Sequence, residues 1–145
     1  TGPMLRRSHM KSTVTLQSGM HFVSEVDGHQ VKMDTVPRGG GEDRGMSPKA
    51  MLLSSLGGCT GMDVIMVLRK MRAEPDAFSM ELEANVTDEH PKVFEKIHIT
   101  YRFKGGSVTR EKAEHAIRLS QDTYCGVSAM LKKAAPIEWD IVIED

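Results

Sequence analysis

Several features that mark particular classes of protein are scarce or absent in this sequence of 145 residues. Its two cysteines, Cys59 and Cys125, are too few for the disulfide scaffold of a small secreted protein. Their separation of 66 residues fits no local zinc-ligand motif. The sequence also shows no internal repeat, no low-complexity tract and no apolar core of a secretory signal.

Neither an excess of charge nor a long apolar run stands out. Nineteen basic residues against twenty acidic ones give a net charge of -1, which argues against a nucleic-acid-binding protein with a strongly basic face. No uninterrupted apolar run reaches the roughly 18 residues that a membrane-spanning helix needs. With 39% apolar and 27% charged residues the chain is globular in composition. We therefore expect a cytoplasmic protein without nucleic-acid or membrane partners.

The length predicts a single domain. His9-Met10 resembles the junction that a cloning site leaves before a native start. We therefore expect residues 1–9 to be a leader or disordered, and residues 10–145 to form the domain.

The pattern of apolar residues predicts an α+β fold with antiparallel sheets around one long central helix. Alternation predicts three strands up to Met33, a second pair over Phe78–Thr87 and Val93–Phe103, and a last strand after Pro136. Two shorter helices are predicted, from Thr109 to about Asp122 and from Cys125 to Lys133.

The central helix is predicted to begin at Pro48, with Ser47 as its N-cap, and to end near Arg72. Apolar side chains lie nearly all the way round it, which is typical of a helix buried on every side. At 1.5 Å per residue it would be about 37 Å long, so we expect a second subunit to help cover it.

Cys59 lies in the middle of this helix among Gly57, Gly58 and Gly61. Each glycine costs a helix about 1 kcal/mol relative to alanine, so its presence needs a reason. Either another element packs closely here, or the missing side chains let a substrate reach the sulfur. Helical spacing places Asp63 one turn beyond Cys59.

Cys125 opens a short helix, where partial positive charge is expected to favour the thiolate and lower the cysteine pKa. The alternative is a small residue that only fills a capping position. Together the two cysteines suggest a peroxide-reactive thiol and a resolving thiol. The competing interpretation is two buried thiols that act as small hydrophobic side chains.

An activated cysteine needs a nearby cation. The sequence predicts surface positions for five histidines: His21, His29, His90, His98 and His115. Arg38 and Arg44 are better candidates, because they lie on the glycine-rich loop Val36–Gly45 and stay charged at any physiological pH. The alternative for both is a solvated loop charge.

These motifs resemble the OsmC/Ohr family, and Gly28-His29-Gln30 with Met33-Asp34 resembles its YhfA-like branch. The matching segments are Ser47-Pro48, Leu56-Gly57-Gly58-Cys59-Thr60, Met62-Asp63-Val64, Ser120–Cys125 and Val127–Lys133. The resemblance implies an intertwined homodimer that reduces organic hydroperoxides at two sites in the subunit interface. It makes Cys59 the peroxidatic thiol and Cys125 the resolving thiol. It also implies an external dithiol reductant such as a lipoyl group, with no metal or organic cofactor.

The sequence departs from the family pattern at the activating residues. The family places a glutamate nine or ten residues before the first cysteine, where this chain has Ala50 and Lys49. The family's arginine in the N-terminal hairpin turn is also missing. Glu42 with Arg38 or Arg44 is the candidate replacement.

A rival hypothesis follows from these departures. The chain would be a non-catalytic or weakly active dimer that binds an apolar small molecule in its methionine-lined interface cavity, or acts as a redox sensor. Methionine is common at permissive binding surfaces. Four of the eleven methionines lie on the helix of Cys59: Met51, Met62, Met66 and Met71.

Overall fold

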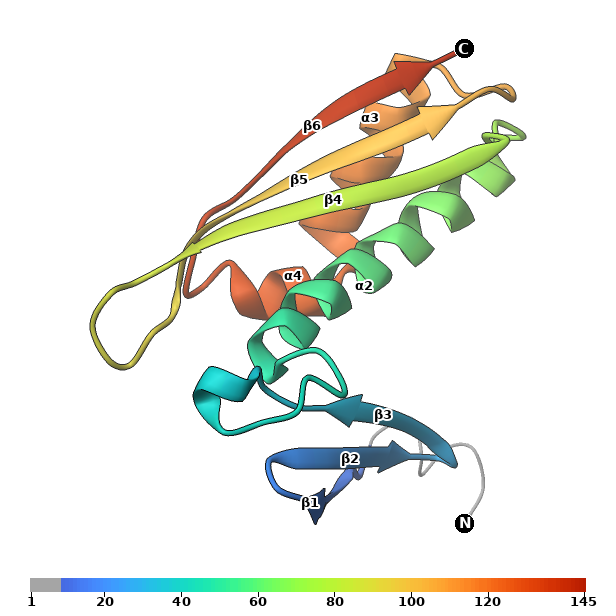
Figure 1. The fold of residues 1–145 in the computed structure, drawn as a ribbon. Coiled ribbons are helices and arrows are strands. Elements are labelled where there is room, and N and C mark those ends of the chain that lie inside the picture. The colour runs from blue at the N-terminus through green and yellow to red at the C-terminus, as the bar shows by residue number, and fades with distance from the viewer. Residues whose placement is uncertain (1–8) are drawn as a thin grey trace. The chain divides into compact units, whose positions relative to one another are not determined.

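The structure, a computed structural model, describes residues 9–145. The expected leader lies outside the described residues, apart from the exposed His9. The chain divides into two compact units, one ending at Leu52 and the other spanning Leu53–Asp145 (Figure 1).

The N-terminal unit contains the predicted three-stranded antiparallel meander. Its strands β1 (Thr13–Ser18), β2 (His21–Val26) and β3 (His29–Met33) pair in that order. The Asp27-Gly28 turn between β2 and β3 has positive φ at both residues, which is the geometry of a type I′ hairpin turn.

The glycine-rich loop after β3 is folded around the buried carboxylate of Asp34. It contains the 3₁₀ turn η1 (Pro37–Gly39), and the Asp34 carboxylate accepts backbone N–H bonds from Thr35, Glu42 and Arg44 at 2.7, 3.3 and 3.1 Å. Burial acts to raise the pKa of Asp34, but these three donors stabilise the charged form and the pKa is lowered. The loop is therefore an organised turn.

The C-terminal unit packs three helices on one face of a three-stranded sheet (Figure 1). The strands are β4 (Ala77–Val86), β5 (Phe94–Lys104) and β6 (Ile137–Glu144), in the order β4-β5-β6. The helices are α2 (Pro48–Lys70), α3 (Arg110–Leu119) and α4 (Gly126–Leu131). The predicted α+β class is confirmed.

One detail of the predicted sheet is wrong, because β6 pairs with β5 in parallel. The strands β4 and β5 are antiparallel, as expected for neighbours joined by a loop. Between β5 and β6 the chain returns through α3, a π-helical turn η2 (Ser120–Tyr124) and α4. A crossover of this kind brings the chain back to the starting end of the sheet, so the next strand runs parallel.

Helix α2 supplies one side of the core, but a single chain does not cover it completely. Leu56, Val64 and Leu68 are fully buried, whereas Met62 is 77% exposed and Met66 is 41% exposed. The expectation of burial on every side is therefore not met within one chain. By length and composition alone α2 could cross a membrane, but the core helices of soluble proteins pass the same test.

Candidate functional site

The two cysteines, far apart in the sequence, lie together in the C-terminal unit. The Sγ atoms of Cys59 and Cys125 and a carboxylate oxygen of Asp63 all lie within 4.8 Å of one another. Both thiols are free; Cys59 is half-buried and Cys125 is 3% exposed. The cluster offers two sulfurs and one carboxylate oxygen, which suits thiol redox chemistry and could also hold a metal ion.

Different elements position the two thiols. Cys59 and Asp63 are one turn apart on α2, as their spacing predicts. The π-helical turn η2 ends at Cys125, whose backbone N–H donates to the Ser120 carbonyl at 2.8 Å. Sequence reasoning expected an α-helix up to about Asp122, but α3 ends at Leu119 and η2 delivers Cys125 to the cluster.

The glycines around Cys59 have different surroundings. A side chain at Gly57 would come within 2.8 Å of Leu82 Cδ1, and one at Gly61 within 2.6 Å of Met80 Cε, so both glycines let β4 pack closely on α2. A side chain at Gly58 would meet nothing within 4 Å, and the same holds at Gly126 beside Cys125. Close packing, one of the two predicted alternatives, therefore occurs at Gly57 and Gly61, whereas access of a substrate to the sulfur stays a prediction.

The electrostatic setting of Cys125 is opposite to the predicted one. Burial, the hydrogen bond with the Cys59 side chain and the charges of Cys59 and Asp63 raise the pKa of Cys125 to about 11. The backbone N–H of Ser128 donates to Cys125 Sγ at 3.3 Å and acts in the other direction, but it is outweighed. The predicted lowering of the pKa is wrong, and this thiol stays protonated at neutral pH.

A chain of buried hydroxyl groups leads from the core to Asp63. Ser120 Oγ donates to Asp63 Oδ2 at 2.9 Å. Because its single proton is used there, Ser120 accepts the hydroxyl proton of Thr60 at 2.8 Å. Thr60 in turn accepts from the Tyr101 hydroxyl at 2.7 Å. All these donors therefore point toward the carboxylate, an arrangement in which each bond strengthens the next.

The same hydrogen-bond network also extends from Tyr101 and Thr60, through Gln121 and Ser128, to Cys125. Gln121 Nε2 donates to the Tyr101 hydroxyl at 3.0 Å and to Thr60 Oγ1 at 3.2 Å. Ser128 Oγ donates to Gln121 Oε1 at 2.6 Å, and the Ser128 N–H holds Cys125. Sequence reasoning missed this network. Its one available signal was a polar residue, Thr60, among the apolar residues of α2.

The predicted activating residues belong to the N-terminal unit. Arg38 lies in η1, and the exposed Arg44 pairs with Glu42 at 3.2 Å. Their action on Cys59 stays a prediction. The predicted surface position of His21 is wrong. This side chain is 7% exposed, near the Asp34 carboxylate, and its ring nitrogens have no hydrogen-bond partner within residues 9–145.

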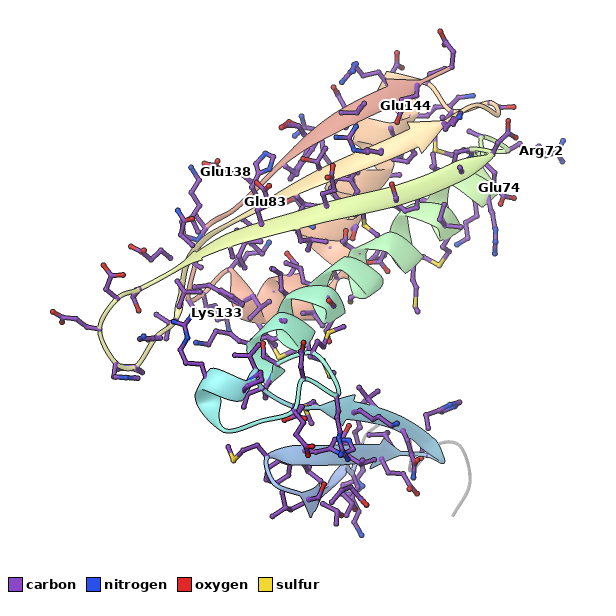
Figure 2. All side chains as sticks on the ribbon, viewed as in Figure 1. Arg72, Glu74, Glu83, Lys133, Glu138 and Glu144 are labelled. Carbon is purple, nitrogen blue, oxygen red and sulfur yellow. The ribbon has the colours of Figure 1, made fainter. Side chains whose placement is uncertain are left out.

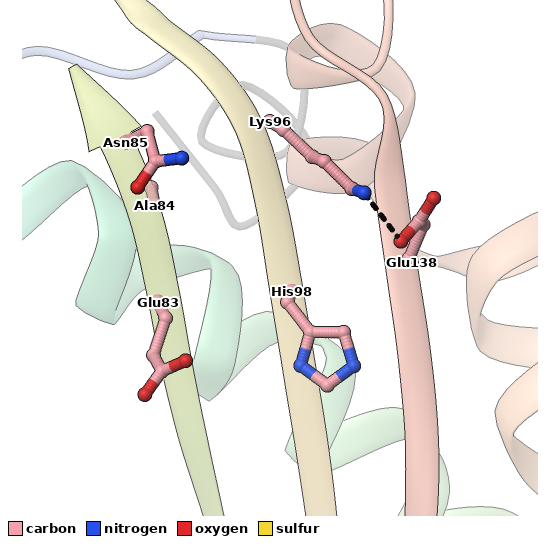
Figure 3. A pocket seen from close by; sticks show the side chains of 6 residues that line it. All are labelled: Glu83, Ala84, Asn85, Lys96, His98 and Glu138. Carbon is pink, nitrogen blue, oxygen red and sulfur yellow. Dashed lines mark ion pairs between the residues drawn. The ribbon is translucent and has the colours of Figure 1, made fainter.

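Two hollows lie away from the thiols. On the C-terminal sheet, a polar hollow of about 270 Å³ is lined by side chains that include Glu83, His98 and Glu138 (Figure 3). Figure 2 labels Glu83 and Glu138 among all the side chains. Within it the Lys96 ammonium pairs with Glu138 at 3.0 Å (Figure 3). In the N-terminal unit, an apolar cavity of about 360 Å³ is lined by side chains that include Met20, Phe22 and Met33.

Fold and site together define an α+β protein in which one thiol lies on a long core helix and a second thiol, from the turn before α4, lies beside it. Residues 40–140 match the model of the OsmC-like protein family, so the chain belongs to this family. It is 32% identical over 129 residues to Protein YhfA of Escherichia coli K12, covering 88% of this chain and 93% of that protein.

Solved structures agree with this assignment. A hypothetical protein from Aquifex aeolicus VF5 is 31% identical, with a TM-score of 0.80 over 94% of this chain and 98% of that one. The organic hydroperoxide resistance protein OhrB of Bacillus subtilis shares the fold, with a TM-score of 0.62 and 18% identity over 92% of this chain and 97% of that one.

Proposed function

We propose that this chain is a thiol-dependent reductase of organic hydroperoxides, with Cys59 as the peroxidatic and Cys125 as the resolving thiol. The observation that carries the proposal is the approach of two free sulfurs to within 4.8 Å in one niche. The partial exposure of Cys59 supports access of a substrate to this niche. Organic hydroperoxide resistance in the name of OhrB supports the substrate class.

In the first step the Cys59 thiolate attacks the terminal oxygen of the hydroperoxide. The S–O bond forms as the O–O bond breaks, so sulfur is oxidised to sulfenic acid and the alkoxide leaves and takes up a proton as the alcohol. Charge develops on the leaving oxygen, where a cation lowers the barrier. We assign this role to Arg38 or Arg44 of the glycine-rich loop, with Glu42 orienting the guanidinium.

In the second step the Cys125 sulfur attacks the sulfenic sulfur of Cys59, which forms a disulfide and releases water. Cys125 is protonated at neutral pH, so its proton has to be removed as the bond forms. Asp63 lies within reach of both sulfurs, and Ser120 holds its carboxylate. We assign Asp63 as the base that takes this proton and passes it to the leaving hydroxide. An external dithiol, such as a lipoyl group, then reduces the disulfide to two thiols and becomes a disulfide itself.

The proposed assembly is a homodimer. Met62 and Met66 are exposed on α2 in the single chain, and a second copy that covers them would bury an apolar surface. We expect the protein to act in the cytoplasm, without nucleic-acid or membrane partners.

Stopped-flow mixing of the reduced protein with cumene hydroperoxide, without oxygen, tests the activity. Wild type should lose thiol much faster than free cysteine, and Cys59→Ser should abolish the reaction. Cys125→Ser should keep the first step but stop turnover with a dithiol. Thiol loss at the rate of free cysteine would contradict the proposal.

The apolar cavity favours a second candidate function, the binding of an apolar small molecule by the N-terminal unit. Met20→Lys should then abolish the binding of an apolar fluorescent probe, whereas Cys59→Ser should leave it unchanged. Equal binding by wild type and Met20→Lys would exclude this cavity as the binding site.

A further inference from the structure

The sulfur and oxygen atoms around Cys59 form a donor set that suits a metal ion as well as thiol redox chemistry. The two sulfurs of the proposed redox pair and the Asp63 carboxylate form a three-ligand group within 4.8 Å. We propose that the reduced chain binds a divalent cation of the Zn²⁺ class through Cys59, Asp63 and Cys125. This site uses the thiols of the proposed reductase but does not depend on peroxidase activity.

The ligand types and their separations suit zinc. Zn²⁺ binds thiolate sulfur at about 2.3 Å and carboxylate oxygen at about 2.0–2.2 Å, usually in tetrahedral geometry. Two sulfurs of one tetrahedron are therefore about 3.8 Å apart. The donor atoms, already within 4.8 Å of one another, need to close by at most about 1 Å to reach this geometry. Three protein ligands leave a fourth position for water or another small ligand.

The surroundings hold the donors as metal sites commonly do. Ligating carboxylates are usually fixed by hydrogen bonds from an outer shell. Here Ser120 donates to Asp63 Oδ2, and Thr60 and Tyr101 donate in series behind it. The Ser128 N–H bonds Cys125 Sγ at 3.3 Å.

A route for the ion is also present. Cys59 is half-buried, and the positions next to the two sulfurs in the chain are Gly58 and Gly126. Neither glycine adds a side chain to the surroundings. Because Cys59 is only half-buried, the ion has access to the site from solvent at this residue.

Metal binding and disulfide formation exclude each other at this site. A disulfide uses both sulfur ligands, so the oxidised protein loses two of its three donors. Conversely, a bound ion occupies the sulfur electrons that attack a hydroperoxide. The metal-bound chain is therefore a protected, inactive form. Once the ion has dissociated, a hydroperoxide oxidises the two free thiolates to a disulfide and is itself reduced, with one water, to the alcohol and two hydroxide ions. The disulfide then prevents the ion from binding again.

Titration of the reduced, metal-free protein with Co²⁺ tests the site directly. One Co²⁺ per chain should give a thiolate-to-cobalt charge-transfer band and the intense visible bands of tetrahedral cobalt, and one equivalent of Zn²⁺ should remove both. The disulfide form, Cys59→Ser and Cys125→Ser should lack the charge-transfer band of a two-thiolate site. Absence of this band in the reduced wild type would overturn the proposal.

Asp63→Asn tests the third ligand, because asparagine keeps the size and an acceptor for Ser120 but loses the charge. Its affinity for Zn²⁺, measured against a chromophoric chelator, should fall at least tenfold. Asp122→Asn is the matched control, since Asp122 is exposed and lies near Cys125 in the sequence, and it should bind like wild type. Equal affinities of all three proteins would refute the three-ligand site. Co²⁺ binding without peroxidase activity would support the metal site and reject the reductase. Peroxidase activity without Co²⁺ binding would support the reductase and reject the metal site.

Discussion

Replacing Thr60 with valine should test whether the buried hydroxyl chain acts as one unit. Valine has nearly the same shape, so the change removes the hydroxyl without opening a cavity. The Tyr101 hydroxyl then loses its acceptor and Ser120 Oγ loses its donor, with Tyr101 and Ser120 both fully buried. An orphaned buried polar group costs about 1–3 kcal/mol, so we expect Thr60→Val to lower the free energy of unfolding by about that amount.

The double-mutant cycle with Ser120→Ala gives the sharper result. Ser120→Ala alone leaves the buried Thr60 hydroxyl without an acceptor for its proton, and Asp63 without this donor. In the double variant the Thr60 donor that Ser120→Ala orphans is itself absent, so the combined loss should be smaller than the sum by about 1 kcal/mol or more. Urea unfolding of all four proteins at one protein concentration measures these values. Additivity within about 0.5 kcal/mol would refute the directed chain.

Three further predictions concern the glycines of α2, the pH dependence of stability, and removal of the Cys125 proton during disulfide closure. Gly58→Ala should raise the free energy of unfolding by about 0.5–1 kcal/mol, because alanine favours the helix and meets no neighbour there. Gly57→Ala forces Leu82 aside, so its free energy of unfolding should be at least about 1 kcal/mol below that of Gly58→Ala. Equal unfolding midpoints of the two variants would contradict this prediction. Burial raises the pKa of Tyr101, so the folded state keeps a proton that the unfolded state loses near pH 10. The free energy of unfolding should therefore fall above pH 10, and it should fall less steeply in Tyr101→Phe than in wild type. Equal pH dependence of the two proteins, measured by urea unfolding on both sides of pH 10, would refute this prediction. Asp63→Asn should slow closure of the disulfide by tenfold or more while leaving the sulfenic acid step unchanged, and rapid-quench mass analysis would show equal closure rates if Asp63 were not the base.

The features that sequence could predict are those that depend on neighbouring residues. Alternation and the Asp27-Gly28 turn sufficed for the N-terminal meander, because a hairpin is determined by its own turn. The start of α2 at Pro48 follows from the residue types at its first turn. The placement of Asp63 beside Cys59 follows from helical spacing alone.

The remaining features depend on contacts between segments far apart in the chain. The parallel pairing of β6 reflects the path of a crossover, which strand alternation does not record. The pKa of Cys125 was predicted with the wrong sign, because the helix start is visible in the sequence whereas burial and the approach of Cys59 are not. Zinc spacing rules describe ligands on short local motifs, so they could not anticipate a donor set completed by a residue 66 positions away.

The central claim is that the two sulfurs form a functional redox pair. The most direct test is peptide mapping by mass spectrometry after the reduced protein reacts with one equivalent of cumene hydroperoxide. We expect a loss of two hydrogen atoms and a linked peptide pair that contains Cys59 and Cys125. In Cys125→Ser we expect a sulfenic acid on Cys59 that dimedone traps. Two free thiols after the reaction, or oxidation of Cys125 with Cys59 left reduced, would show that the two sulfurs are not a redox pair.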